Sequence, residues 1–137
     1  MIPILLDTNI ILDIALKREK FYNDAACIFI KIHKKELSAY ISASSITDIF
    51  YLLKKSAGKE VTRQFLMKLI KFVDIIEVNR KTVIEALSLQ WNDFEDAIQE
   101  CVALHNNINI IITRNKKDFS QSQLTVLSPS ELLNHLS

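Results

Sequence analysis

The chain is poor in the residues that interrupt regular structure. Among its 137 residues there are one glycine, Gly58, and two prolines. A single glycine excludes the glycine-rich loops that cradle phosphates in P-loop enzymes and dinucleotide-binding folds. A hydrophobic content of 49% with so few breakers is typical of compact, element-rich chains and not of disordered ones. We therefore expect one globular domain over residues 1–137.

Cysteine is also scarce, with only Cys27 and Cys101 present. Both lie among apolar residues at helical spacing, so we expect two reduced core thiols in a cytoplasmic protein. Cys101 and His105 are spaced i, i+4, as zinc ligands on a helix can be, but no further Cys/His cluster supplies the remaining ligands. Both residues are therefore expected to be ordinary core residues.

Long hydrophobic runs and an excess of one charge are missing as well. No apolar run approaches membrane-spanning length, and no basic segment precedes the first hydrophobic stretch, so neither a membrane span nor a signal peptide is expected. The formal net charge is +1, which gives no bulk attraction to a polyanion. A local basic patch could still bind nucleic acid.

Apolar periodicity predicts strands that alternate with helices. Strands are expected at residues 2–6, 37–42, 74–78, 108–113 and 124–127. Helices are expected at about 9–17, 21–34, from a cap at Ser44 or Ser45 to Gly58, 60–72 (with Val61, Phe65, Leu69 and Phe72 on one stripe), 80–90, 92–105 and from Pro129 onward. Alternating strands and helices imply parallel pairing through right-handed crossovers, and hence an α/β/α sandwich.

Four aspartates recur at comparable junctions of this pattern, at strand ends or in first helical turns. They are Asp7, Asp48, Asp96 and Asp118. Each has a structural alternative when taken alone. Asp7 could be part of a helix cap, Asp48 could form a capping box with Ser45, Asp96 could lie on a solvated helix face, and Asp118 could belong to a polar turn. Together they predict one acidic site, because the carboxyl ends of parallel strands meet at one edge of a sheet.

Four carboxylates at one edge cannot all stay ionised and unpaired, because like charges repel. A hard divalent cation such as Mg²⁺ or Mn²⁺ would resolve the conflict, since these ions prefer carboxylate and water oxygens. Removing one charge by Asp7→Asn is then expected to relieve repulsion in the metal-free protein.

Basic and aromatic residues give weaker signals. Of three basic clusters, the one at Arg114, Lys116 and Lys117 flanks Asp118 and could hold a phosphodiester near a metal ion. The alternative for each of these residues is a solvated loop charge. Trp91 is expected to belong to the core.

At these residues the chain resembles a PIN domain, in particular the stand-alone PIN proteins of prokaryotes, many of which are VapC-like ribonuclease toxins paired with an antitoxin. The matching segments follow one another in the family's order over nearly the whole chain. They are Leu5-Leu6-Asp7-Thr8-Asn9, Phe21-Tyr22-x-Asp24-Ala25, Ser42-Ala43-x-Ser45-x-Thr47-Asp48, Asp93-Phe94-Glu95-Asp96-Ala97, and Ile112-Thr113-Arg114-Asn115-Lys116-x-Asp118-Phe119.

The resemblance implies a parallel five-stranded sheet between helices and a metal-dependent endoribonuclease. The implied catalytic and metal-binding residues around Mg²⁺ or Mn²⁺ are Asp7, Asp48, Asp96 and Asp118. The residues expected to orient ligands or phosphate oxygens are Thr8, Asn9, Ser45, Thr113, Arg114 and Asn115. The implied partners are an RNA substrate, a cognate antitoxin and a second copy of the chain.

The chain departs from the family pattern at two positions. The second acid is usually Glu, and Asp48 is one methylene shorter, so it would bind metal directly or through water. The last motif often has Asp where this chain has Asn115, so the fourth ligand is either Asn115 or Asp118.

Two other function classes were weighed. A phosphotransferase resembling haloacid dehalogenases needs a second Asp two residues after the first, and that position is Asn9. A catalytically degenerate PIN fold, acting as a scaffold or RNA-binding module, should have lost acids, whereas all four positions carry Asp. The sequence therefore favours the nuclease.

Overall fold

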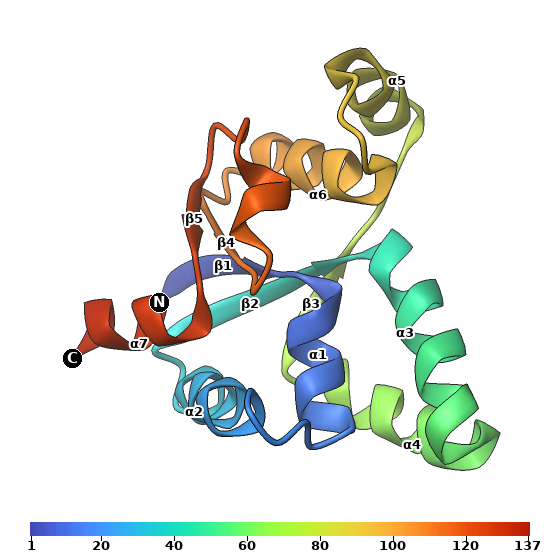
Figure 1. Cartoon of the computed structure of the whole chain (residues 1–137), viewed down its shortest axis with the longest axis vertical. Helices are drawn as coiled ribbons and strands as arrows, with labels where there is room; N and C mark the ends of the chain where they lie inside the picture. Colours follow the sequence, from blue (N-terminus) through green and yellow to red (C-terminus); the bar gives the residue numbers. More distant parts are fainter.

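The protein, seen here in a computed structural model that describes residues 1–137, is a five-stranded parallel sheet between two helical layers (Figure 1). The strands are β1 (Ile2–Leu6), β2 (Leu37–Ser42), β3 (Val73–Ile76), β4 (Ile110–Ile112) and β5 (Thr125–Leu127). Every neighbouring pair is parallel. The predicted α/β/α sandwich is confirmed.

Seven α-helices and one 3₁₀ turn connect these strands. They are α1 (Thr8–Ala15), α2 (Tyr22–His33), α3 (Ala43–Ala57), α4 (Lys59–Leu69), α5 (Arg80–Leu89), α6 (Phe94–His105), the 3₁₀ turn η1 (Lys116–Phe119) and α7 (Pro129–Leu136). None of the helices is long and apolar enough to cross a lipid bilayer.

The strand order is β3-β2-β1-β4-β5. The chain winds outward from β1 through β2 to β3 and then continues on the other side of β1 with β4 and β5. The order therefore reverses between β1 and β4, and ligands of open parallel sheets bind at such a switch point, beyond the carboxyl ends of the strands. Asp7 directly follows β1, and Thr113 directly follows β4.

The central strand β1 is buried on both faces, as its unbroken apolar sequence requires. Ile4 and Leu6 point into a core formed with α1, α2, α3, α4 and α7, whereas Leu5 points into a second core beneath α5 and α6. Figure 1 shows α5 and α6 on one side of the sheet and the other five helices on the opposite side. This double burial fixes the register of β1, and with it the position of Asp7.

Several local expectations were wrong. Cys27 is exposed, because the buried stripe of α2 runs through Ala25, Ile28 and Ile32 and leaves position 27 outside it. Cys101 is buried as expected, but His105, expected to be a core residue with it, is exposed and pairs with Glu85. Val61 on α4 and Phe72, which lies beyond the end of α4, were expected on the buried stripe, but both are exposed.

Several element boundaries also differ from the expected ones, among them β3 at Val73–Ile76 in place of 74–78, and two of the differences have a clear local cause. Helix α3 is capped by Ser42, whose hydroxyl accepts from the Ser44 backbone N–H, so the cap lies before the two serines expected to provide it. Strand β4 does not include Ile108, because the Ile108 N–H donates to the Ala103 carbonyl and completes the turn after α6.

Candidate active site at the switch point

Asp7 lies at the topological switch point and is held there by three hydrogen bonds. Its Oδ1 accepts from the Thr8 backbone N–H at 2.8 Å and from Gln99 Nε2 at 3.1 Å. Its Oδ2 accepts from Thr113 Oγ1 at 2.7 Å. The Asp7 N–H donates to the Ile112 carbonyl, which ties the residue to β4. Asp7 is therefore both the cap of α1 and a buried carboxylate of fixed orientation.

The second buried aspartate, Asp96, lies in the first turn of α6. Asp93 caps this helix by accepting from the Asp96 N–H at 3.0 Å. One turn later, Gln99 is fully buried and reaches Asp7 from the same helix. The amino end of α6 therefore brings a carboxylate and a carboxamide to the end of β1.

Glu95 is an acid of this site that the sequence reasoning missed. Its Oε1 accepts from Ser45 Oγ at 3.0 Å and from Thr8 Oγ1 at 3.4 Å. Burial is the main reason that its pKa is raised, and the charges of Asp48 and Asp7 raise it further, against hydrogen bonds from nearby serine hydroxyls. Glu95 thus lies between the first turns of α1 and α3. The charged motif Asp93-Phe94-Glu95-Asp96 was the available signal, but only Asp96 was selected from it.

The two remaining predicted acids lie at the rim. Asp48 and Asp118 are both exposed. Asp48 lies near enough to Glu95 for its charge to raise the pKa of Glu95. In the same way, the charge of Asp118 raises the pKa of Asp96. The structure therefore places the four aspartates on one edge of the sheet, with two buried and two exposed.

The predicted orienting residues divide into two groups. Thr8, Ser45 and Thr113 bind the carboxylates of Asp7 or Glu95 through the hydrogen bonds described above, and Asn115 supports Thr113 by donating its backbone N–H to Thr113 Oγ1 at 3.0 Å. The Asn115 side chain is exposed.

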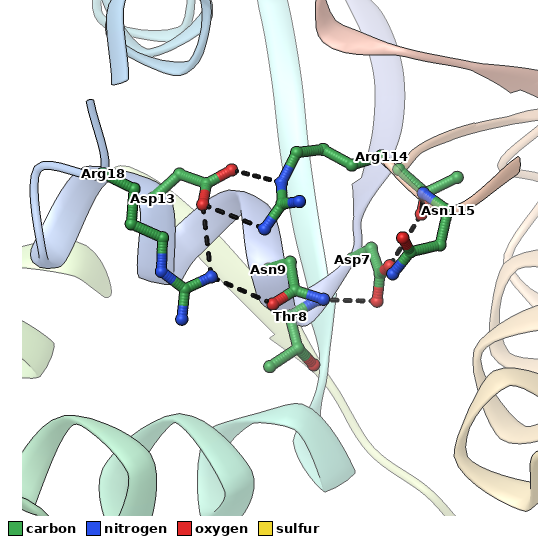
Figure 2. Close-up of polar contacts among 8 residues, drawn as sticks. Asp7, Thr8, Asn9, Asp13, Arg18, Arg114 and Asn115 are labelled. Carbon is green, nitrogen blue, oxygen red and sulfur yellow. Dashed lines mark hydrogen bonds and ion pairs between the residues drawn. The ribbon is translucent and has the colours of Figure 1, made fainter. Parts of the chain in front are cut away.

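Arg114 and Asn9 belong to a different cluster (Figure 2). The Arg114 guanidinium points to Asp13, donating from Nε to Oδ2 at 2.8 Å and from Nη2 to Oδ1 at 3.2 Å. Arg18 donates to Asp13 Oδ1 at 3.3 Å and to Asn9 Oδ1 at 3.2 Å. The Arg114 guanidinium also stacks 3.8 Å from the centre of the Phe21 ring. Arg114, which was expected to orient a phosphate near the metal, thus binds a buried carboxylate outside the acidic edge.

Electrostatic strain in the site is concentrated on Asp96. Its pKa is raised from 3.8 to about 7, first by burial and then by the charges of Asp93, Asp7, Asp118 and Glu95. Asp7, in contrast, has hydrogen-bond donors on both oxygens. Near neutral pH, Asp96 is therefore the carboxyl group that the cluster leaves partly protonated.

This strain predicts a pH-dependent stability. Because the pKa of Asp96 is raised in the folded state, its contribution is fully present below about pH 4 and is lost as the pH rises to about 7. The free energy of unfolding of the metal-free protein should fall by up to about 4 kcal/mol over this interval through Asp96. Urea denaturation from pH 4 to 8 measures it, with Asp96→Asn as the comparison. The variant should equal or exceed the wild type at pH 8, and parallel curves would contradict the assignment.

The donor set of this edge fits a hard divalent cation. Each acid of the site supplies carboxylate oxygens. Gln99 Oε1 is a further buried oxygen, and it has no hydrogen-bond partner. Oxygen-only donors of this kind suit Mg²⁺ or Mn²⁺ and not zinc. No three His, Cys, Asp or Glu side chains are gathered closely enough to enclose a metal ion in this structure. A bound cation would have to draw the carboxylates together against their mutual repulsion.

Solved structures with the same fold come from several bacteria. VapBC2 of Rickettsia felis, solved with a DNA fragment from its promoter, matches with a TM-score of 0.70 and 20% identity over 93% of this chain and 98% of that chain. VapBC-1 of nontypeable Haemophilus influenzae gives a TM-score of 0.71 and 18% identity over 94% and 99%. The sarcin-ricin loop cleaving toxin VapC20 of Mycobacterium tuberculosis gives 0.65 and 15% over 79% and 86%. At these identities the likeness concerns the fold.

No curated protein sequence matches the chain significantly. The model of the PIN domain family, however, matches residues 3–117, which includes the acids Asp7, Asp48 and Asp96 and ends one residue before Asp118. This range covers most of the chain and all strands except β5. The protein therefore belongs to the PIN domain family.

Proposed function

We propose that the protein is a metal-dependent endoribonuclease that hydrolyses RNA phosphodiester bonds. The observation that carries the proposal is the buried Asp7 carboxylate, fixed at the switch point of the sheet by Thr113 and Gln99 and surrounded by further acids. Membership of the PIN domain family supports it. The alternative of a degenerate scaffold is disfavoured because the acids are all present.

In this proposal the principal metal ligands are Asp7 and Asp96. Asp48 and Asp118 assist from the rim, and the free Gln99 Oε1 is a further oxygen donor. A bound Mg²⁺ or Mn²⁺ would polarise the scissile phosphate and lower the pKa of an attacking water.

The side chains around Asp7 have two further roles in this proposal, to orient a metal ligand and to accept a proton. Thr113 and Gln99 hold both oxygens of Asp7 in place, so that its orientation needs no reorganisation when substrate arrives. Glu95 binds Ser45 through Oε1 and has a raised pKa, so its carboxylate is suited to accept the proton of the attacking water. We assign Glu95 as the general base.

The test is cleavage of an unstructured RNA by the purified protein with Mg²⁺, with Mn²⁺ and with EDTA. Cleavage is expected with either metal and should be lost in EDTA, because the reaction needs the cation to polarise the phosphate. A DNA oligonucleotide of the same sequence is the matched control. Equal cleavage in EDTA would contradict metal dependence, and no cleavage with either metal would favour the scaffold.

We further propose that this nuclease is the toxin of a type II toxin–antitoxin pair in the cytoplasm and acts as a homodimer. Several structural neighbours are toxin–antitoxin complexes. An apolar groove of about 190 Å³ between α1, α2 and α4 could accept an apolar antitoxin segment, and the acidic edge could accept a basic side chain. The hydrophobic residues that line this groove are Ile14, Phe29, Phe65, Leu69 and Phe72.

Two experiments test these proposals. Co-purification with the product of a neighbouring gene, with loss of RNA cleavage in the complex, tests the toxin–antitoxin pairing. Light scattering of the purified protein tests the homodimer.

A further inference from the structure

A polar pocket adjoins the carboxylates between the α5–α6 connection and the segment after β4. Its volume is about 200 Å³, and it has a single hydrophobic lining residue. Its two acidic lining residues, Asp93 and Asp118, belong to the acidic edge. The other lining residues are Trp91, Gln90, Asn92, Lys117, Ser120 and Gln121. One aromatic ring and three carboxamides therefore share one hollow.

The aromatic wall of this pocket is anchored to the core. The Trp91 ring meets Phe119 edge to face, with centroids 6.0 Å apart at 85°, and Phe119 is buried. Trp91 itself is only half-buried and lines the pocket, so the expectation that it is a core residue was wrong in part. Next to it, Asp93 is fixed as the cap of α6. The wall is thus held in place before any ligand binds.

The composition of the lining excludes several ligand classes. Lys117 is the only cation of the lining and is outnumbered by two carboxylates, so the pocket is a poor site for an isolated phosphate. With one hydrophobic residue it is also a poor site for an apolar side chain. The lining suits an uncharged, flat group with hydrogen-bond donors and acceptors at its edge. Nucleobases have these properties, and proteins bind unpaired bases by stacking on aromatic rings and hydrogen bonding to base edges.

The pocket is also continuous with the acidic edge. Asp93 and Asp118 line the pocket, and Asp93 Oδ1 accepts the backbone N–H of Asp96 at 3.0 Å. A ligand that fills the pocket therefore lies directly beside the carboxylates assigned to the scissile phosphate.

We propose that this pocket binds the base of a nucleotide flanking the scissile phosphate of single-stranded RNA. Trp91 stacks on the base, and the carboxamides of Gln90, Asn92 and Gln121 hydrogen-bond to its edge, which makes the pocket a determinant of cleavage-site sequence. Lys117 contacts the backbone of the same nucleotide. The inference rests on the proposed ribonuclease function, and its test is run without cleavage so that the two can fail separately.

The test uses Trp91 as its own reporter, because it is the single tryptophan of the chain. The full-length protein is titrated in EDTA with hexaadenylate, with hexauridylate and with a hexameric ribose-phosphate chain that lacks bases. Quenching of Trp91 fluorescence by a base-containing hexamer but not by the abasic one is expected, because only a base can stack. Absence of quenching, or equal quenching by the abasic chain, overturns the inference. Quenching without cleavage in Mg²⁺ overturns the proposed function only.

Variants locate the site by fluorescence anisotropy of a labelled hexamer. Trp91→Ala should weaken binding by about 5-fold to 100-fold, with partial rescue in Trp91→Phe. Because Trp91→Ala could disturb packing on Phe119, the exposed Gln121→Ala serves as a second variant, with an expected loss of about 2-fold to 10-fold. Gln64→Ala, an exposed carboxamide on α4, is the matched control and should bind like the wild type. Equal affinities for the Gln121 and Gln64 variants overturn the inference.

Discussion

Asp7→Asn is expected to reduce metal-dependent RNA cleavage by at least about 100-fold, which corresponds to about 2.7 kcal/mol of activation free energy. The reason is that Asp7 is the only site carboxylate that accepts from both α6, through Gln99, and the residue that follows β4, Thr113. An amide in its place keeps the shape but loses the charge and one acceptor oxygen. The measurement is the initial rate of cleavage of a fluorophore-labelled RNA in Mg²⁺.

The matched control is Asp74→Asn, which removes one exposed carboxylate from the edge strand β3. It should cleave at the wild-type rate, because it lies outside the acidic edge. A rate for Asp7→Asn within about threefold of the wild type would remove Asp7 from the site. Circular dichroism of both variants establishes that they are folded.

The structure changes the expected stability of Asp7→Asn. Crowding of four acids predicted that this substitution would relieve repulsion, but the repulsion is concentrated on Asp96, and Asp7 is satisfied by three donors. Losing one or two of these hydrogen bonds costs about 1 kcal/mol each. The stabilising substitution near neutral pH is therefore Asp96→Asn.

The second large effect is expected from Arg114→Met, which should lower the free energy of unfolding by about 3 kcal/mol or more. Asp13 is fully buried, and Arg114 provides two of its three hydrogen bonds from the other end of the chain. Without Arg114, the buried Asp13 carboxylate keeps only Arg18, and uncompensated buried charge is costly. Urea denaturation at pH 7 measures the change.

Two further variants distinguish the buried Arg114–Asp13 ion pair from an ordinary surface ion pair. Lys116→Met removes the neighbouring cation, whose partner Glu131 is exposed, and should leave the free energy of unfolding nearly unchanged. The double variant Asp13→Leu/Arg114→Met removes both charges and should recover part of the loss, since the carboxylate is no longer left unpaired. Equal losses in the free energy of unfolding for Arg114→Met and Lys116→Met would show that the buried ion pair contributes no more than an exposed one.

The sequence was most informative where local pattern decides the outcome. The apolar run of β1 ends at Asp7 and is typical of a strand buried on both faces, so this strand and the first acid could be predicted, and the alternation of such strands with helices predicted the fold. Asp96 could be found for a similar reason, since it lies in the first turn of a helix with a strong apolar stripe.

The sequence was least informative where pairing across the chain decides the outcome. Arg114 binds Asp13 at a separation of 101 positions, and no local pattern distinguishes this pairing from a phosphate contact. Glu95 and Gln99 were missed because polar residues of α6 resemble a solvated face, whereas the helix is buried from Asp96 to Ala103. Helical periodicity does not reveal that the segment before β5 covers the polar side of α6, where Ser122 and Gln123 donate to Glu100.

The most direct test of the central claim is the position of Mn²⁺ in crystals of the wild-type protein soaked in manganese chloride. Anomalous scattering locates this ion without reference to activity. The account predicts a peak bonded to carboxylate oxygens of both Asp7 and Asp96, and its loss in Asp7→Asn. Mn²⁺ bound elsewhere, with no peak between these two residues, would contradict the account.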